Sequence, residues 1–235
     1  MLLRRVAFAS RAAEGETRVK GTSWLMTAAL AIALALAGCG DASDQLNSED
    51  AGKRLEAIHH LAGQGDAASV ARLGQATEHE DPWTAREAVW ALARAPHPSA
   101  SEAIHRVLKT DKRAEVRQMA VLALGRRCEN NSRQVLREVA RTDPDGAVRA
   151  EAAAAVGMVG TLDDVALLAD VAATDADPTV QSRAVAAAGA LLGITFHYDT
   201  KAPEAERRKM LETIRSIAPT MAQRLREAMA QEGTP

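Results

Sequence analysis

The stretch DPDGAVRAEAAAAVG, Asp143 to Gly157, contains the pattern that decides the fold. An Asp-Pro pair is followed by Val-Arg and then by a run dominated by alanine. Asp favours the N-cap of a helix and Pro suits its first turn, so Asp143-Pro144 predicts a helix start. Alanine has the highest helix propensity. The stretch therefore predicts a helix with a small-residue surface that a neighbouring helix can approach closely.

Versions of this helix recur along the chain at intervals of 31, 32, 32 and 32 residues. The five copies are RLEAIHHLA from Arg54, AREAVWALA from Ala85, RQMAVLALG from Arg117, RAEAAAAVG from Arg149 and QSRAVAAAG from Gln181. The fourth position is always alanine, and the fifth and eighth positions are apolar, so one side of each helix is suited to burial. Glycines fall near the expected helix ends, at Gly125, Gly157 and Gly189, and beyond them, at Gly160 and Gly193, where glycine helps a chain turn.

A second helix is predicted in each unit. An apolar anchor follows nineteen residues after the first four starts, at Leu73, Ile104, Leu136 and Leu168. Two helices in about 32 residues, repeated in series, predict an all-α solenoid. After the fifth copy the period ends, and the apolar residues of Pro203 to Gln231 keep helical spacing on both sides of Pro219. We expect two capping helices there, because the ends of a solenoid need to be covered.

The pattern Asp-Pro-x-x-x-Val-Arg-x-x-Ala-x-x-Ala-Leu-Gly resembles HEAT repeats of the short, phycobilisome-lyase-like type. The resemblance implies a right-handed α-solenoid of about five two-helix repeats over residues 51–201, with a C-terminal helical cap at 202–235. It implies no particular function. The bilin lyases that share this repeat attach pigments, but the sequence has no matching pigment pocket and only 3% aromatic residues.

The N-terminal residues predict export. Residues 1–20 carry five basic and two acidic side chains, and Trp24 to Gly38 is free of charge over 15 residues. A basic lead before a short apolar run is typical of a signal peptide, because a membrane-spanning helix needs roughly 20 apolar residues. Leu36-Ala37-Gly38-Cys39 resembles the lipobox of bacterial lipoproteins. The resemblance implies cleavage of residues 1–38 and lipidation of Cys39; the alternative is an ordinary signal peptide with an incidental cysteine.

The lipobox resemblance, with Gly40 after the cysteine, favours a lipid-anchored protein of the bacterial cell envelope, at the outer membrane and facing the periplasm. Residues 39–50 would then be the lipidated cysteine and a polar tether. The chain that remains has 24 basic and 29 acidic residues, a net charge of −5. This acidic balance and the export signal argue against nucleic acid as a partner.

The sequence contains no convincing catalytic or metal-binding arrangement. One HEAT-repeat enzyme class, deoxyhypusine hydroxylase, binds iron through His-Glu pairs in several repeats, whereas this chain has a single such pair, at His79-Glu80. Cys128 follows two arginines, and nearby cations favour a reactive thiol, but an incidental turn cysteine is the simpler interpretation. We therefore predict no enzyme activity, no cofactor, no metal and no small-molecule substrate.

The outward positions of the second helices are the candidate partner-binding residues. In HEAT-like stacks these helices line the concave face that holds the partner. The candidates are His105, Arg106, Lys109, Arg137, Glu138 and Arg141. They form either a solvated helix face or a groove for an acidic or extended segment. Trp83, in the first turn of its helix, is either an interface anchor or packing over a loop. The rings of Phe196, His197 and Tyr198 predict a loop packed under the cap, or alternatively a contact loop.

These observations favour a membrane-anchored, non-catalytic scaffold that holds a protein or peptide on the concave face of the solenoid. The alternative is an assembly or maturation factor for another envelope protein or enzyme. A lipid anchor would raise the concentration of the protein near a membrane complex in either case.

Overall fold

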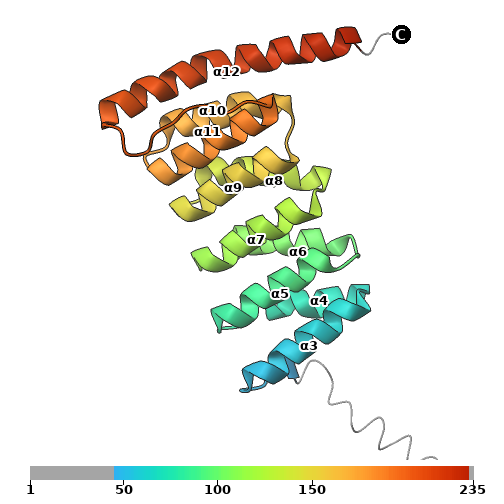
Figure 1. Cartoon of the computed structure of the whole chain (residues 1–235). Helices are drawn as coiled ribbons and strands as arrows, with labels where there is room; N and C mark the ends of the chain where they lie inside the picture. Colours follow the sequence, from blue (N-terminus) through green and yellow to red (C-terminus); the bar gives the residue numbers. More distant parts are fainter. Residues whose placement is uncertain (1–44, 233–235) are drawn as a thin grey trace, which may run out of the picture. The chain divides into compact units, whose positions relative to one another are not determined.

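The computed structural model describes residues 45–232, so the predicted signal peptide and Cys39 lie outside the described residues. Every regular element in that range is helical, and the helices stack in pairs along the chain (Figure 1). The prediction of an all-α solenoid is confirmed. The described residues contain no helix that is long and apolar enough to cross a membrane.

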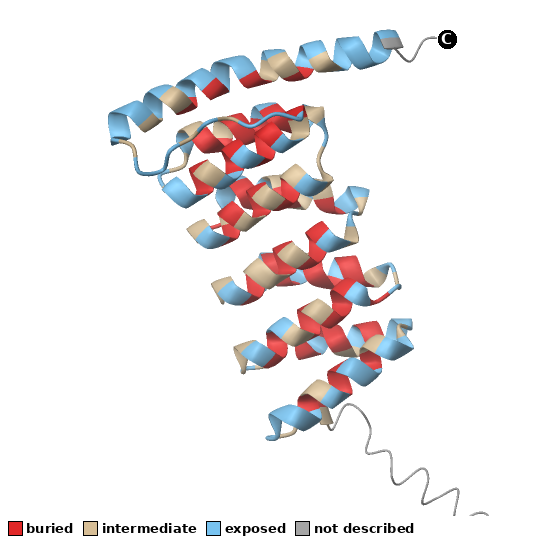
Figure 2. Ribbon diagram, in the orientation of Figure 1, coloured by how far each residue is buried: buried red, intermediate tan, exposed pale blue. Residues whose placement is uncertain are grey.

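The helices form two rows. The first row contains α3 (Ala51–Gln64), α5 (Pro82–Arg94), α7 (Ala114–Arg127), α9 (Gly146–Val159) and α11 (Pro178–Leu192). The second row contains α4 (Ala67–Ala76), α6 (Ser99–Thr110), α8 (Asn130–Thr142), α10 (Val165–Thr174) and α12 (Glu204–Glu232), with a short 3-10 helix η1 (Leu162–Asp164) before α10. The buried residues lie on the sides of the helices that the two rows turn toward each other (Figure 2).

Two other Asp-Pro pairs begin helices, but the helix start predicted at Asp143-Pro144 is wrong. Asp81 and Asp177 cap α5 and α11 with proline in the first turn. At the third pair the cap is Asp145, whose carboxylate accepts the N–H groups of Ala147 and Val148, and α9 begins two residues later than expected. Asp143 is instead buried against an arginine of the preceding unit.

Small residues let the first-row helices come close together. A Cβ atom added to Gly157 of α9 would lie 2.7 Å from the Cβ and 2.9 Å from the Cα of Ala187 in α11. Gly157 lies near the end of α9, as expected, but still inside the helix, and its missing side chain makes room for α11. The turn after α11 uses Gly193 at φ 69°, and the end of α7 uses Cys128 at φ 50°.

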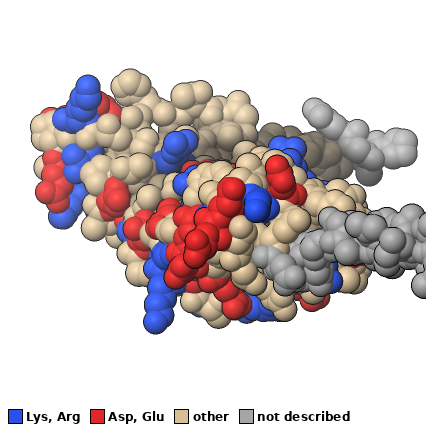
Figure 3. Space-filling model, turned by 90° about the horizontal axis from the view of Figure 1, so that it is seen from below, with Lys and Arg blue, Asp and Glu red and all other residues tan. Residues whose placement is uncertain are grey.

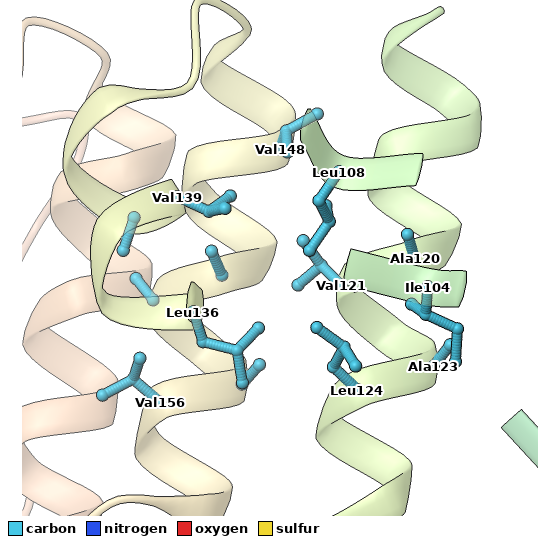
Figure 4. Close-up of a cluster of buried hydrophobic side chains, with 14 of the residues drawn as sticks. Ile104, Leu108, Ala120, Val121, Ala123, Leu124, Leu136, Val139, Val148 and Val156 are labelled. Atoms are coloured by element: carbon cyan, nitrogen blue, oxygen red, sulfur yellow. The ribbon is translucent and has the colours of Figure 1, made fainter. Parts of the chain in front are cut away.

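The interior between the rows is built from branched aliphatic side chains and alanine. Ile104 of α6, Val121 and Leu124 of α7 and Leu136 of α8 are fully buried and converge in one cluster (Figure 4). Burial of each such side chain contributes about 1.5–3 kcal/mol. The apolar positions predicted from the repeat are thus the core that connects successive units.

The C-terminal segment is one helix, so the prediction of two capping helices is wrong. Pro219 lies inside α12, which runs from Glu204 to Glu232. Leu211, Ile214, Ala218 and Ala222 are buried on one continuous stripe of this helix, and α12 packs on α10. Proline removes one backbone donor, but the unbroken apolar stripe holds the helix together across that position.

Candidate binding face

The surface formed by the outward sides of α6, α8 and α10, called here the second-helix face, carries two adjoining grooves. Each of these helices buries a central aliphatic residue, Ile104, Leu136 or Leu168, and turns polar residues outward. On each helix, the polar side chains at the two edges of its outward side lie next to the neighbouring helices. The grooves lie at these borders.

The groove between α6 and α8 has a volume of about 580 Å³. Leu108, Val135 and Val139 give it an apolar floor, and the three have little or only partial exposure. Its polar side chains come mainly from the C-terminal ends of the two helices and the loops after them. They are Lys109, Thr110, Asp111, Lys112, Arg117, Glu138, Thr142 and Asp143.

The groove between α8 and α10 has a volume of about 570 Å³. It is lined by Gln134, Arg137, Glu138, Arg141, Thr142, Asp163, Asp164, Ala166 and Leu167. Glu138 and Thr142 border both grooves, so the two form one surface that crosses α8. Three of the residues predicted to bind a partner, Lys109, Glu138 and Arg141, are exposed on it.

Arg137 also lines this surface, but its positive charge is already paired within the fold. Its guanidinium forms a salt bridge with Asp164, whose side chain is only 1% exposed. The hydrogen bond to Asp164 is the main cause that raises the pKa of Arg137 above its ordinary value. Asp164 also accepts the N–H of Thr161 at 2.8 Å. Arg137 therefore joins α8 to the turn before α10.

The side chain of His105 likewise makes its contact within the fold. Its Nε2 lies 3.3 Å from the hydroxyl of Ser132 in α8, and the side chain is partly buried. Burial, followed by the charge of Lys109, lowers the pKa of His105 below its ordinary value. Near neutral pH the ring is therefore uncharged, and it provides packing and a hydrogen bond between α6 and α8 rather than a positive contact.

Arg106 and Trp83 lie outside the two grooves. Arg106 is exposed on the outward side of α6. Trp83 is 42% exposed at the start of α5, in the other row of helices. Two rings of the predicted loop, Phe196 and Tyr198, pack against the core, and the Tyr198 hydroxyl donates to Gln181 at 2.5 Å. His197 is exposed.

Successive units are joined by a series of arginine–aspartate pairs that the repeat pattern did not predict. Arg117 binds Asp143 through two hydrogen bonds of 2.8 Å, and Arg149 binds Asp175 at 2.7 and 3.0 Å. The arginine is the first residue of the repeated segment in both cases. The aspartates stand two residues before a helix cap, in the sequences DPD and DAD. This spacing of the arginine and the aspartate is the sequence signal from which the pairs could have been predicted.

The series changes where the sequence departs from the repeat. Ala85 stands where an arginine is expected, and Asp111 instead pairs with Arg113 of its own loop. Position 79 is histidine rather than aspartate, and Arg54 binds Asp81, the cap of α5, at 2.9 Å. These pairs leave Asp81, Asp111, Asp143 and Asp175 bound within the fold. Their negative charges are therefore compensated along the edge of the second-helix face.

The charged side chains that remain available in the grooves are mostly basic. Lys109, Lys112 and Arg141 are exposed and form no ion pair with another described residue. Of the exposed acids in the grooves, Glu138 forms no such pair and Asp163 binds Arg226 at 3.2 Å. The N-terminal end of the stack contrasts with this surface: seen from the α3 end, acidic side chains gather near the centre of the view (Figure 3). Across residues 45–232, no three His, Cys, Asp or Glu side chains are grouped to hold a metal ion.

The comparison with protein families identifies the repeats. Residues 41–118 and 101–189 match the family model for HEAT repeats, and together these ranges cover more than half of the chain. The chain belongs to the HEAT-repeat family. A comparison with curated proteins gives no match.

Two solved structures resemble parts of this HEAT-repeat chain. One is the complex of CpcE and CpcF of phycocyanin lyase from Nostoc sp. PCC7120, at 23% identity and a TM-score of 0.45. The match covers 64% of this chain and 63% of that one, so the chain spans less than two thirds of the lyase chain's length. The other is an engineered protein from a structural genomics consortium, at 18% identity and a TM-score of 0.45, over 77% of this chain and 96% of that one.

Proposed function

We propose that this HEAT-repeat protein is a lipid-anchored, non-catalytic binding protein of the bacterial cell envelope. In this proposal it holds an extended acidic segment of a protein partner across the second-helix face. The observation that carries the proposal is the pair of adjoining grooves over α6, α8 and α10, in which three exposed basic side chains face one exposed unpaired acid.

The form of the grooves supports an extended segment as the ligand. Each groove lies between two helices and has aliphatic side chains at its base, such as Val135 in one and Leu167 in the other. A segment that crosses α8 would bury side chains on both sides of Glu138 and Thr142. Basic side chains at such a surface speed the encounter with an acidic partner and fix its register.

The sequence Leu36-Ala37-Gly38-Cys39 supports the membrane anchor. A diacylated cysteine, together with a further acyl chain, would hold the protein stably, because each buried methylene contributes about 0.8 kcal/mol. Gly40 supports an outer-membrane location facing the periplasm. Metabolic labelling with palmitate tests the anchor: label is expected on the wild-type protein and absent from Cys39→Ser. Equal labelling of both would contradict it.

The binding face is tested by cross-linking in intact cells. We expect a defined envelope protein to cross-link to the wild-type chain and to be lost with Lys109→Glu/Arg141→Glu. The matched control is Arg183→Glu/Arg224→Glu, which makes the same change of net charge at two exposed positions away from both grooves. Arg137 is left intact because reversing its charge beside buried Asp164 would disturb the fold. Equal loss in both double variants, or loss in neither, would contradict the proposal.

A further inference from the structure

The outward side of α5 combines exposed aromatic and basic side chains. Trp83 and Trp90 are seven residues apart, which is two helical turns, so they lie on the same side of the helix. Trp83 is 42% exposed, and Trp90 is partly exposed. Tryptophan is enriched where proteins meet the headgroup region of a membrane, because its ring is apolar and its N–H is polar.

Arginines surround these two rings. Arg86 and Arg94 are exposed on the same side of α5, and Arg126 of α7 lies over the Trp90 ring with its guanidinium carbon 5.3 Å from the ring centroid. Glu87, half buried, is the acidic residue among the outward positions of α5. The face formed by Trp83, Arg86, Trp90, Arg94 and Arg126, called here the α5 face, is therefore basic and aromatic.

The chain enters the fold at the N-terminal unit, and its last residues before α3 are tied to the start of α5. The Arg54 guanidinium donates to the carbonyls of Ser48 and Glu49, at 2.8 and 3.0 Å, and to the carboxylate of Asp81 at 2.9 Å. Asp81 caps α5 and accepts the N–H of Trp83 at 3.2 Å. One arginine thus ties the last residues before α3 to the cap of α5. Leu46, further back along the chain, is 7% exposed and borders the end of α4 and the turn after it, so the link to Cys39 leaves from the N-terminal unit of the stack.

That link is short. Gln45 to Asp50 already lie against the fold, with Leu46 buried, so residues 40–44 link Cys39 to it and span at most roughly 17–18 Å when extended. We propose, on the basis of the lipid anchor proposed above, that the α5 face rests on the surface of the anionic bilayer that holds Cys39. In this arrangement Trp83 lies at headgroup depth, and the arginines contact lipid phosphates.

Charge argues for this orientation of the body. The N-terminal end of the stack is acidic (Figure 3): between positions 45 and 80 the exposed acids are Glu49, Asp50, Glu56, Asp66, Glu78 and Glu80, and the basic residues are Lys53, Arg54 and Arg72. An anionic surface repels that end and attracts the α5 face. Because the two rows bury the sides that they turn toward each other, the second-helix face then points away from the bilayer and stays open to a partner.

Fluorescence quenching by brominated lipid tests the contact. Removal of residues 1–38 leaves Trp83 and Trp90 as the tryptophans of the processed chain. The lipidated Trp90→Phe variant is reconstituted in vesicles of phosphatidylethanolamine and phosphatidylglycerol, with plain or brominated acyl chains. We expect the emission of Trp83 to fall about twofold in the brominated vesicles, because its ring reaches the acyl boundary. A control variant, Trp83→Phe/Trp90→Phe/Gln134→Trp, moves the reporter to the second-helix face and should not be quenched.

The outcomes separate this inference from the anchor. A protein that floats with the vesicles while Trp83 is unquenched, or is quenched no more than the reporter at position 134, overturns the contact and leaves the anchor standing. A processed protein that does not float overturns the anchor and the contact together. Arg86→Glu/Arg94→Glu should still float but show weaker quenching of Trp83; unchanged quenching would overturn the role of the arginines.

Discussion

Arg117 and Asp143 show how single residues connect the repeats. Both side chains are buried, at 8% and 5% exposure, and two parallel hydrogen bonds join them. Arg117 also donates to the carbonyls of Asp111 and Lys112 at 3.1 Å. A buried charge that loses its partner is costly because it remains desolvated. The pair therefore holds α7 against the loop before α9 and makes neighbouring units depend on each other.

Arg117→Ala should lower the free energy of unfolding by about 3–5 kcal/mol, since it leaves Asp143 buried without a partner. Urea denaturation measures this change. Replacing both residues, as Arg117→Met/Asp143→Leu, should cost less than the single change because no buried charge remains. Arg208→Ala is the exposed control: its pair with Glu204 is 72% and 65% exposed, so its effect should stay within about 1 kcal/mol. Equal effects of Arg117→Ala and Arg208→Ala would contradict this account.

The lowered pKa of Asp81 predicts that the stability of the fold depends on pH in the acid range. The Thr84 hydroxyl, and after it Arg54, lower the pKa of Asp81 to about 2 from its ordinary 3.8. Because the folded-state pKa is depressed, the charged side chain stabilises the fold above about pH 4, and this contribution is lost as the pH falls toward about 2. Asp81→Asn keeps a helix cap. Because the variant lacks the stabilising negative charge, it should be less stable than wild type near neutral pH. In urea titrations, the difference in the free energy of unfolding should shrink between about pH 4 and pH 2. A constant difference would refute this.

At the scale of elements, the rows of helices use their residues differently. First-row helices approach through glycine and alanine, as at Gly157 and Ala187. Second-row helices α6, α8 and α10 carry larger aliphatic and charged side chains and leave grooves between them. The small residues of one row thus connect the units tightly, while the larger residues of the other row form the surface that we propose binds a partner.

Gly157→Ala should destabilise the fold although alanine favours helices. The added methyl would meet the backbone and side chain of Ala187 at less than 3 Å, and overpacking of this kind costs about 1–3 kcal/mol. Gly63 is the matched control, since it lies inside α3 with no atom within 4 Å of an added Cβ. Gly63→Ala should stabilise by up to about 1 kcal/mol. Thermal unfolding checks both, and a stabilising Gly157→Ala would contradict close packing of α9 and α11.

The sequence predicted the elements better than their ends and contacts. The repeated alanines and aliphatic anchors predicted the helix pairs, because burial at fixed helical spacing is visible in a single chain. The sequence did not show that Asp143 is an ion-pair partner and Asp145 the cap, since both carboxylates suit a helix start. Pro219 suggested a break, but continued burial of the α12 stripe outweighed the lost hydrogen bond.

The sequence predicted which side of the helices forms the candidate site, but only some of the residues that are available there. Lys109, Glu138 and Arg141 could be assigned to the outward side of their helices by spacing alone. Arg137 occupies a similar position, but its salt bridge to Asp164 depends on how η1 turns into α10, which the spacing does not show. The hydrogen bond of His105 across to Ser132 depends in the same way on the approach of α8.

In the whole molecule, the two rows of helices have different proposed tasks. The first row carries the α5 face, which we propose rests on the bilayer. The second row carries the grooves, which we propose hold the partner. An acidic segment bound in the grooves would then be held near the membrane by the tether between Cys39 and α3, and the lipid anchor would act by raising local concentration rather than by adding contacts.

Site-specific photo-cross-linking in living cells tests most directly whether the second-helix face binds the partner. A photoreactive amino acid replaces Gln134, which lines the groove between α8 and α10, or Ala186, which is exposed on α11 in the first row. We expect a discrete cross-linked partner from position 134 that disappears with Lys109→Glu/Arg141→Glu, and no such product from position 186. The same partner captured from position 186 but not from position 134 would contradict the assignment of the second-helix face as the binding surface.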